Sequence, residues 1–145
     1  MLITRATEYA IRAVLFLAKQ PCGEIVFKKD ICRTQNITPA FLTKIFQPLI
    51  KAGIVGSQRG VGGGFYLLKS PHEVSLLDVV QAQEGPLYIN QCLTREGACE
   101  RDVFCPVHGA WREIRGELMS TLSRYTFAHL IHEEEKKQQQ KAQHL

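Results

Sequence analysis

Apolar residues recur at three- and four-residue spacing over the first fifty positions, a pattern typical of amphipathic helices. One helix is expected over residues 4–19, where Ala13 and Leu17 share a face with other apolar side chains. A second, short helix is expected over residues 28–35. It is followed by Asn36, a residue that tolerates the left-handed conformation of a helix stop.

The third expected helix has the clearest boundary signals. Thr38 is a good N-cap, and Pro39 follows at the first helical position, where its missing N–H costs no hydrogen bond. An apolar stripe runs through residues 41–50, and Gly53 supplies the stop. Pro48 removes one backbone hydrogen bond, so we expect the last turn to bend.

Two short strands, over residues 54–57 and 65–68, are expected to form a hairpin after the third helix. Four of the five residues 60–64 between them are glycines, so we expect a mobile tip whose backbone other molecules can approach closely. Ser75 opens a capping-box-like start for a helix that runs through residue 82.

The second half of the chain is expected to hold an irregular loop and one long amphipathic helix. The apolar face of that helix packs on its own domain or, in the interpretation we favour, on a second copy. This dimer interface would comprise Trp111, Ile114, Leu118, Leu122 and Tyr125.

The order of these elements predicts a winged helix-turn-helix. The expected fold is mainly α with a small β-hairpin and a long C-terminal dimerisation helix. The divisions are a DNA-binding domain at 1–83, a cysteine-rich loop at 84–106, the dimerisation helix at 107–132 and a disordered polar tail at 133–145.

Charge is divided unevenly along the chain. Residues 1–70 hold ten Lys and Arg but three Asp and Glu, whereas the net charge of all 145 residues is +4. A basic first half favours a polyanion such as double-stranded DNA. The expected contacts are Thr38, Pro39, Ala40, Thr43, Lys44 and Gln47 from the third helix and Arg59, Gly62 and Gly63 from the hairpin.

Composition narrows the remaining classes of function. Hydrophobic residues make up 45% and charged residues 22%, as in ordinary globular proteins. An apolar run of eighteen residues is absent, and the amphipathic N-terminus does not resemble a signal peptide, so we expect a cytoplasmic protein without a membrane partner. A Ser/His/Asp arrangement is also absent, so we expect neither an enzyme nor a small-molecule substrate.

The five cysteines point to metal or redox chemistry. An odd number of cysteines without a secretion signal argues against a disulfide framework. Cys92, Cys99, Cys105 and His108 form a set of three thiolates and one imidazole that suits a metal. The six- and five-residue gaps between the cysteines are wider than in most structural zinc sites and favour an iron–sulfur cluster. Zinc and free redox-active thiols stay open as alternatives.

Together these motifs resemble the IscR/NsrR type of bacterial winged-helix regulator, the Rrf2 family. The resemblance covers residues 1–132. It rests on Leu2-Ile3-Thr4 through Ala10, Ile37 to Phe46, Lys51 to Val55, Arg59 to Phe65, and Cys105-Pro106-Val107-His108 with Trp111.

The resemblance implies a homodimer with crossing long helices, and a cluster near the dimer interface that changes the affinity for a palindromic operator. The three cysteines match the family's cysteine ligands, and His108 matches the fourth ligand of 2Fe-2S members. Glu8 matches a carboxylate ligand of nitric-oxide-sensing and redox-sensing relatives. We favour His108 and a 2Fe-2S cluster over Glu8 and a 4Fe-4S cluster.

The sequence departs from the IscR pattern in two places, which limits the family properties that we expect for this chain. The first cysteine gap is one residue longer, and Thr43 replaces an acidic residue, so the operator preference is not carried over. The resulting hypothesis is a transcriptional regulator that senses cluster status, redox state or nitric oxide. The alternatives are a cluster-free repressor controlled by thiols or a partner, and a zinc-stabilised DNA-binding protein.

Overall fold

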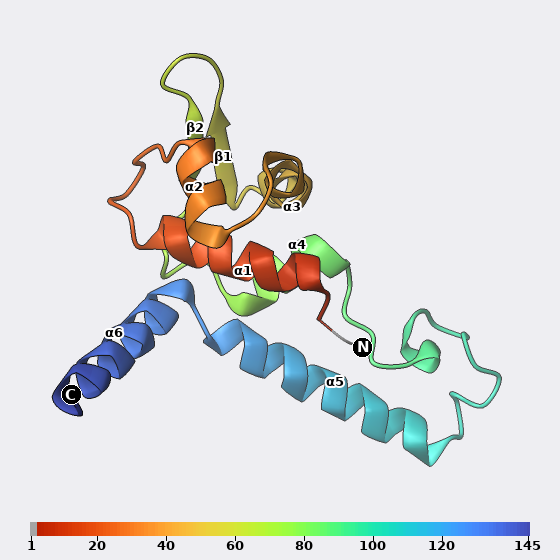
Figure 1. Ribbon diagram of the computed structural model, residues 1–145. Coiled ribbons are helices and arrows are strands. Elements are labelled where there is room, and N and C mark those ends of the chain that lie inside the picture. Colours follow the sequence, from red (N-terminus) through yellow and green to blue (C-terminus); the bar gives the residue numbers. More distant parts are fainter. Residues whose placement is uncertain (1–2) are drawn as a thin grey trace.

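The computed structural model describes residues 3–145, so Met1 and Leu2, which open the expected 1–83 domain and its first motif, lie outside it. The described elements are α1 (Arg5–Ala18), α2 (Lys28–Gln35), α3 (Pro39–Lys51), β1 (Val55–Gln58), β2 (Gly64–Leu67), α4 (Leu76–Glu84), the 3-10 turn η1 (Gln91–Leu93), α5 (Pro106–Arg124) and α6 (Phe127–Gln143) (Figure 1). None of the helices in this part of the chain is long and apolar enough to span a membrane.

Local signals in the sequence set the ends of the first helices as expected. Asn36 adopts a left-handed φ of 52° after α2, and Gly53 has a φ of 72° just after α3. The Thr38 side chain caps α3 by accepting a hydrogen bond of 3.1 Å from the amide of Phe41. Pro48 lies inside α3 without ending it. The sequence predicted these helix ends correctly. Together they leave only a short connection between α2 and α3.

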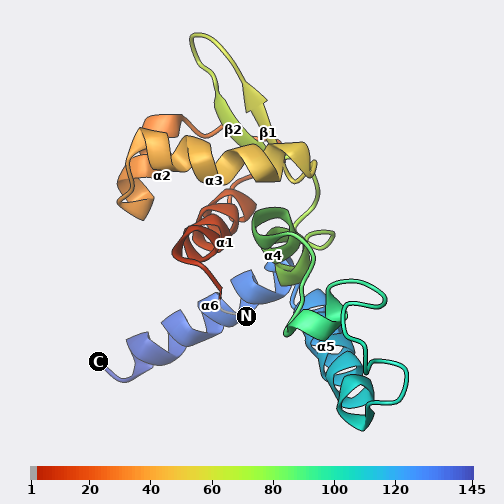
Figure 2. The same ribbon diagram turned by 90° about the vertical axis from the view of Figure 1, so that its right-hand side faces the viewer.

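The two strands form an antiparallel hairpin, in which Val55 lies opposite Leu67 and Gln58 opposite Gly64. A bridge from Val26 to Phe65 joins the segment before α2 to the hairpin, with backbone hydrogen bonds of 2.8 and 2.9 Å. The hairpin projects at one end of the molecule, while α5 and α6 diverge at the opposite end (Figure 2). This is the winged helix-turn-helix arrangement that the sequence predicts.

Helix α1 lies at the centre of the core. Its residues Ala10, Ala13 and Val14 are fully buried, and α1 packs against α2, α3, α4 and α6. Phe46 of α3 meets Phe65 of the hairpin edge to face, with ring centroids 4.8 Å apart. The hairpin is therefore anchored to α3 through the same core that surrounds α1.

The expectation of one helix over residues 107–132 is wrong. The helix breaks at Tyr125, and the Thr126 side chain caps α6 by accepting from the amide of His129 at 3.2 Å. The break has a tertiary cause, because the Tyr125 carbonyl accepts a hydrogen bond of 2.9 Å from Leu76. Phe127 then enters the core fully buried, which turns the chain back toward α1.

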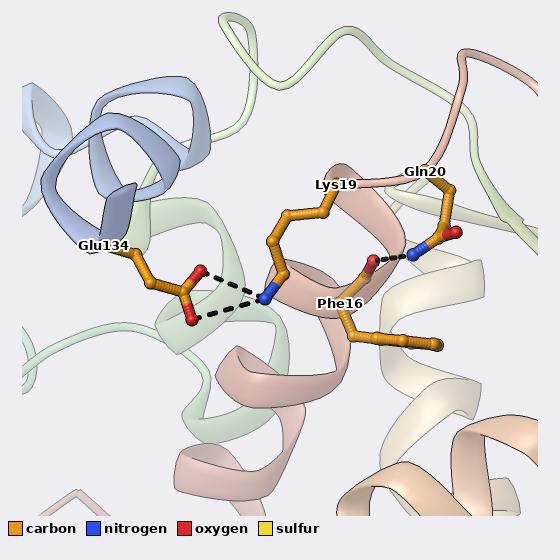
Figure 3. Close-up of polar contacts among 4 residues, drawn as sticks. All are labelled: Phe16, Lys19, Gln20 and Glu134. Atoms are coloured by element: carbon orange, nitrogen blue, oxygen red, sulfur yellow. Dashed lines mark hydrogen bonds and ion pairs between the residues drawn. The ribbon is translucent and has the colours of Figure 1, made fainter. Parts of the chain in front are cut away.

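The tail expected to be disordered from residue 133 is helical, because α6 continues to Gln143. Leu130 and Ile131 pack against the core on the side of α1. Lys19 at the end of α1 pairs with Glu134 at 3.0 Å, as Figure 3 shows. Composition alone could not reveal this helix, because its support comes from residues more than a hundred positions earlier.

A carboxylate clamp joins the start of α1 to the end of α4. The amide and hydroxyl of Thr4 donate to Glu84 at 3.0 and 2.7 Å, and the buried hydroxyl of Thr7 donates to the same oxygen. Burial by itself would raise the pKa of Glu84, but the hydrogen bonds from Thr7 and Thr4 favour the ionised form and lower it.

We predict that Glu84→Gln lowers the stability of the fold by about 1 kcal/mol at neutral pH, because it removes the charge that these donors stabilise. The pKa of Glu84 is lower in the folded than in the unfolded protein. The stability that this carboxylate contributes is therefore fully present above its unfolded pKa and is lost as pH falls through its folded pKa. The difference in urea midpoint between the variant and the wild type should therefore shrink from pH 7 to pH 3. Glu117→Gln, at an exposed position on α5, is the control. A difference in urea midpoint between Glu84→Gln and the wild type that stays the same at all pH values would contradict the stabilising role of the clamp.

Candidate functional site

The start of α3 presents the side chains expected to contact DNA. Thr38, Pro39, Ala40, Lys44 and Gln47 are exposed, and Thr43 is half-buried. The Thr43 hydroxyl is already engaged, because it donates to the Pro39 carbonyl at 3.0 Å and accepts from Lys28 at 2.7 Å. Lys28 therefore holds its ammonium group beside the middle of α3.

Three basic residues near α3 were not identified from the sequence. Besides Lys28, Arg5 and Arg12 of α1 lie over the ring of Tyr9, at 5.7 and 5.2 Å from its centroid. Tyr9 in turn meets Phe41 of α3 edge to face at 5.5 Å. Only the packing of α1 and α2 against α3 gathers these charges, although each is visible as a basic residue in the sequence.

The wing, defined here as residues 58–64, adopts a closed turn. Gly60 and Gly62 adopt φ values of 92° and 79°, which favour glycine, and Arg59 is exposed at its start. The Gly63 amide donates to the Gly60 carbonyl at 3.0 Å. A Cβ atom on Gly63 would collide with the carbonyl oxygen of Gln58. Glycine at this position therefore lets the chain close tightly behind Arg59.

The three cysteines of the second constellation lie on the segment between α4 and α5. Cys92 is in η1, Cys99 follows in a turn, and Cys105 is the N-cap residue of α5. All three are half-buried free thiols. Cys32 is buried in the core, as expected for a small apolar residue, and Cys22 is exposed in its turn.

An open cavity of about 580 Å³ lies between this segment and α5. Cys92 and His108 both line it, whereas Cys99 and Cys105 do not. Its other lining residues include three guanidinium groups and two carboxylates, from Arg95, Arg112, Arg115, Glu96 and Asp102. The cavity thus combines one thiol and one imidazole with a cluster of charges.

Two buried polar atoms have no hydrogen-bond partner among residues 3–145: Nδ1 of His108, which lines this cavity, and Oδ1 of Asn90, two residues before Cys92. The side-chain amide of Asn90 donates to the Cys92 sulfur at 3.2 Å, and Nε2 of His108 lies 3.1 Å from the Arg112 guanidinium. An unpartnered buried polar atom is costly and commonly marks a place where a ligand or an ion binds.

The donor set fits a metal or an iron–sulfur cluster in kind, since it combines three thiols of the segment before α5 with an imidazole from the first turn of α5. The set is not preassembled, because the described residues contain no group of three His, Cys, Asp or Glu side chains close enough to hold one ion. Glu8 is exposed on α1 and does not line the cavity. Loading would therefore require the cysteine segment to close.

Helix α5 leaves its expected interface uncovered. It contributes no buried residue within the described chain and packs mainly against α4 and η1. Trp111 and Ile114 are 38% and 48% exposed, Tyr125 is exposed, and Leu118 and Leu122 are half-buried. Figure 1 shows α5 extending away from the winged domain.

Residues 3–133 match the Rrf2 family, which is described as an iron-dependent transcriptional regulator. The chain is 32% identical to the HTH-type transcriptional regulator IscR of Pectobacterium carotovorum, over 93% of this chain and 82% of that protein. It is 30% identical to the regulator NsrR of Shouchella clausii, over 90% and 89% of the two chains.

Solved structures show the same fold. CymR, the global cysteine regulator of B. subtilis, superposes with a TM-score of 0.70 at 27% identity, over 90% of this chain and 95% of its own. IscR of T. potens superposes with a TM-score of 0.74 at 23% identity, over 95% and 91% of the two chains. At 23% identity the second likeness shows the fold alone.

We predict that Gly63→Ala opens the wing without unfolding the core. Trypsin should then cleave after Arg59 several-fold faster than in the wild type, while the melting temperature changes little, because the wing contributes little to the core. Gly116→Ala in α5 is the matched control, since its added methyl group meets nothing within 4 Å. Equal cleavage rates in the Gly63→Ala variant and the wild type would show that the turn tolerates a side chain.

Proposed function

The chain belongs to the Rrf2 family of transcriptional regulators, DNA-binding proteins of the winged-helix type, and we propose that an iron–sulfur cluster held by its cysteine segment controls its affinity for DNA. One observation carries this proposal. Cys92 and His108, whose Nδ1 is buried without a partner in the described chain, line one cavity, and the segment that carries Cys92 supplies two further thiols.

The proposed ligands are Cys92, Cys99, Cys105 and His108, with Glu8 as the alternative fourth ligand. His108 is favoured because it already shares the cavity with Cys92, whereas Glu8 is on a different, exposed helix face. This choice favours a 2Fe-2S over a 4Fe-4S cluster. Bound there, a cluster would supply a centre that responds to oxidation, iron loss or nitric oxide. Zinc is less favoured because of the wide cysteine gaps.

For DNA, we propose that the exposed N-terminal half of α3 enters the major groove. Lys44 and Gln47 can reach base edges there, while Lys28 lies where it can contact a phosphate. Arg59 on the closed wing suits a neighbouring minor groove. Thr43 mainly fixes Lys28, so its hydroxyl has less freedom to read a base than the sequence suggests.

We propose that the exposed face of α5 pairs with a second copy of the chain. Its support is the apolar spacing from Trp111 to Tyr125 on a helix that its own chain leaves uncovered. A twofold dimer places two α3 helices on two half-sites, which makes a palindromic operator the expected target.

The connections of the cysteine segment explain how its state could reach DNA. The segment begins directly after α4, whose last residue, Glu84, is clamped to α1, and Arg115 of α5 donates to the Leu87 carbonyl. At the other end of α5, Tyr125 is bonded to the start of α4 through Leu76. A change in the segment therefore acts on the angle between α5 and the winged domain. A coupling of about 1–3 kcal/mol would change operator affinity about 5- to 150-fold.

A second candidate function is a cluster-free repressor regulated by thiols or by a partner. The observation that favours it is that the thiols are not preassembled in the structure. The structural likeness to CymR, a cysteine regulator, adds weight at 27% identity. The two functions differ in one measurable property, since only the first requires bound iron and sulfide.

The test begins with anaerobic purification, a visible spectrum and iron and sulfide analysis. We expect a coloured protein with about two irons and two sulfides per chain, and loss of both in Cys92→Ser, Cys99→Ser and Cys105→Ser. Cys22→Ser is the matched control and should keep the colour, because that thiol is exposed and does not line the cavity. Holo and cluster-free protein should bind a DNA selected from a random pool with affinities that differ about 5- to 150-fold.

The outcomes separate the alternatives. About four irons per chain, with retention in His108→Ala and loss in Glu8→Gln, would assign the fourth position to Glu8. A colourless protein that reconstitution leaves unchanged would contradict the cluster and leave the thiol- or partner-regulated repressor. Equal DNA affinity with and without the cluster would contradict the sensing role while leaving the cluster in place.

We predict that Ile114→Glu separates the dimer into monomers in sedimentation velocity, because a carboxylate would be buried in an apolar interface. DNA affinity should fall with it, since the two half-sites would no longer be bound together. Glu117→Gln changes a charge on the same helix and should stay dimeric. A wild-type monomer, or a dimer that survives Ile114→Glu, would exclude this face as the interface.

A further inference from the structure

One contact at the cavity restricts the chemistry of the proposed fourth ligand. His108 and Arg112 lie one turn apart on α5, and a guanidinium nitrogen of Arg112 is 3.1 Å from Nε2 of His108. The other ring nitrogen, Nδ1, is buried without a hydrogen-bond partner among residues 3–145. Both residues line the cavity that Cys92 also lines.

The donor properties of arginine fix the tautomer of this histidine. A guanidinium keeps its protons in proteins, so it can only donate and never accept. Nε2 of His108 must therefore accept from Arg112 with its lone pair. In the neutral imidazole the single proton is then on Nδ1, where the described structure offers it no acceptor.

An imidazole in this state cannot bind a metal, because a metal ligand needs a free lone pair on one ring nitrogen. The lone pair of Nε2 is occupied by Arg112, and Nδ1 carries the proton. Binding through Nε2 displaces Arg112 directly. Binding through Nδ1 requires the proton on Nε2, where it would point at an N–H group of Arg112.

We propose that Arg112 is a positioning residue that competes with the metal centre for His108, so that His108 can act as a ligand only after Arg112 has moved away. The inference rests on the proposed function, since it concerns the fourth ligand of the cluster. The released guanidinium has two carboxylates within the same cavity, on Glu96 and Asp102. The competition weakens the fourth ligand bond and makes the cluster easier to lose.

The opposite effect is expected if Arg112 acts only through its charge. A cation beside thiolates and an anionic cluster would stabilise the bound state, so removing it would speed cluster loss. Arg95 supplies a built-in comparison, because it lines the same cavity and shows no contact with His108 in the described structure. The sign of the change therefore distinguishes competition from electrostatic support.

The first measurement uses the cluster-free protein. Long-range nitrogen–proton NMR correlations of the imidazoles, recorded well above the ordinary histidine pKa of about 6.5, report which ring nitrogen carries the proton. The NMR signals of His108 are identified by their absence from the spectrum of His108→Ala. We expect the proton on Nδ1 in the wild type and on Nε2 in Arg112→Met, which keeps an unbranched side chain but has no donor. A wild-type proton on Nε2 would overturn the inference.

The second measurement uses the anaerobically loaded protein and follows the decay of its visible absorbance after an iron chelator is added. Arg112→Met should lose the cluster about twofold more slowly than the wild type, as expected for one side-chain pair on an exposed helix face. Arg112→Lys, which restores a donor, should return toward the wild-type rate. Arg95→Met should lose it at the wild-type rate or faster. In a His108→Ala background the effect of Arg112→Met should vanish, because the residues act as a pair.

Faster or unchanged loss in Arg112→Met would overturn the inference while leaving the cluster itself established. A wild-type chain that takes up no cluster contradicts the proposed function instead. In that case the tautomer measured in the cluster-free protein alone decides whether Arg112 fixes the state of His108.

Discussion

Close packing around α1 is the constraint on which the rest of the structure depends. Alanine side chains at positions 10 and 13 let α3, α4 and α6 approach the same helix, and Phe46, Val79 and Phe127 of those elements are buried in the same core. Because the interior of a protein is packed at crystal-like density, a shift of any one of these helices must be accommodated by the others. The DNA-binding half and the C-terminal helix consequently share one core.

The candidate cavity differs from this core in the way it is held. It lies on a segment with a single 3-10 turn, beside a helix that buries no residue of its own in the described chain. Leu87 is the one buried residue of 85–105, and a segment with so little buried surface lies at the low end of local stability. A low cost of rearrangement suits a site that must close around a ligand, whereas α3 and the wing need a fixed shape.

Hydrogen bonds reinforce the packing of α5 on α4 that connects these two parts. Glu84 joins α4 to α1, Arg115 holds the Leu87 carbonyl, and Leu76 holds the end of α5. In the proposed mechanism, a change in the cysteine segment would act through these contacts on the angle between α5 and the winged domain.

Sequence by itself determined the elements of the winged domain, because caps and glycine turns are local, and its ligand spacing proposed the residues of the candidate site. Thr38, Asn36 and Gly53 set helix ends through bonds within a few residues. Tertiary structure alone decided the break at Tyr125, the helical course of residues 133–143 and the clamp on Glu84, whose partners are about eighty residues away. It also decided that Lys28 meets Thr43 and that, of the four proposed ligands, Cys92 and His108 line the cavity while Cys99 and Cys105 do not. Such contacts depend on where whole elements pack, and the periodicity of a single helix carries no information about its neighbours.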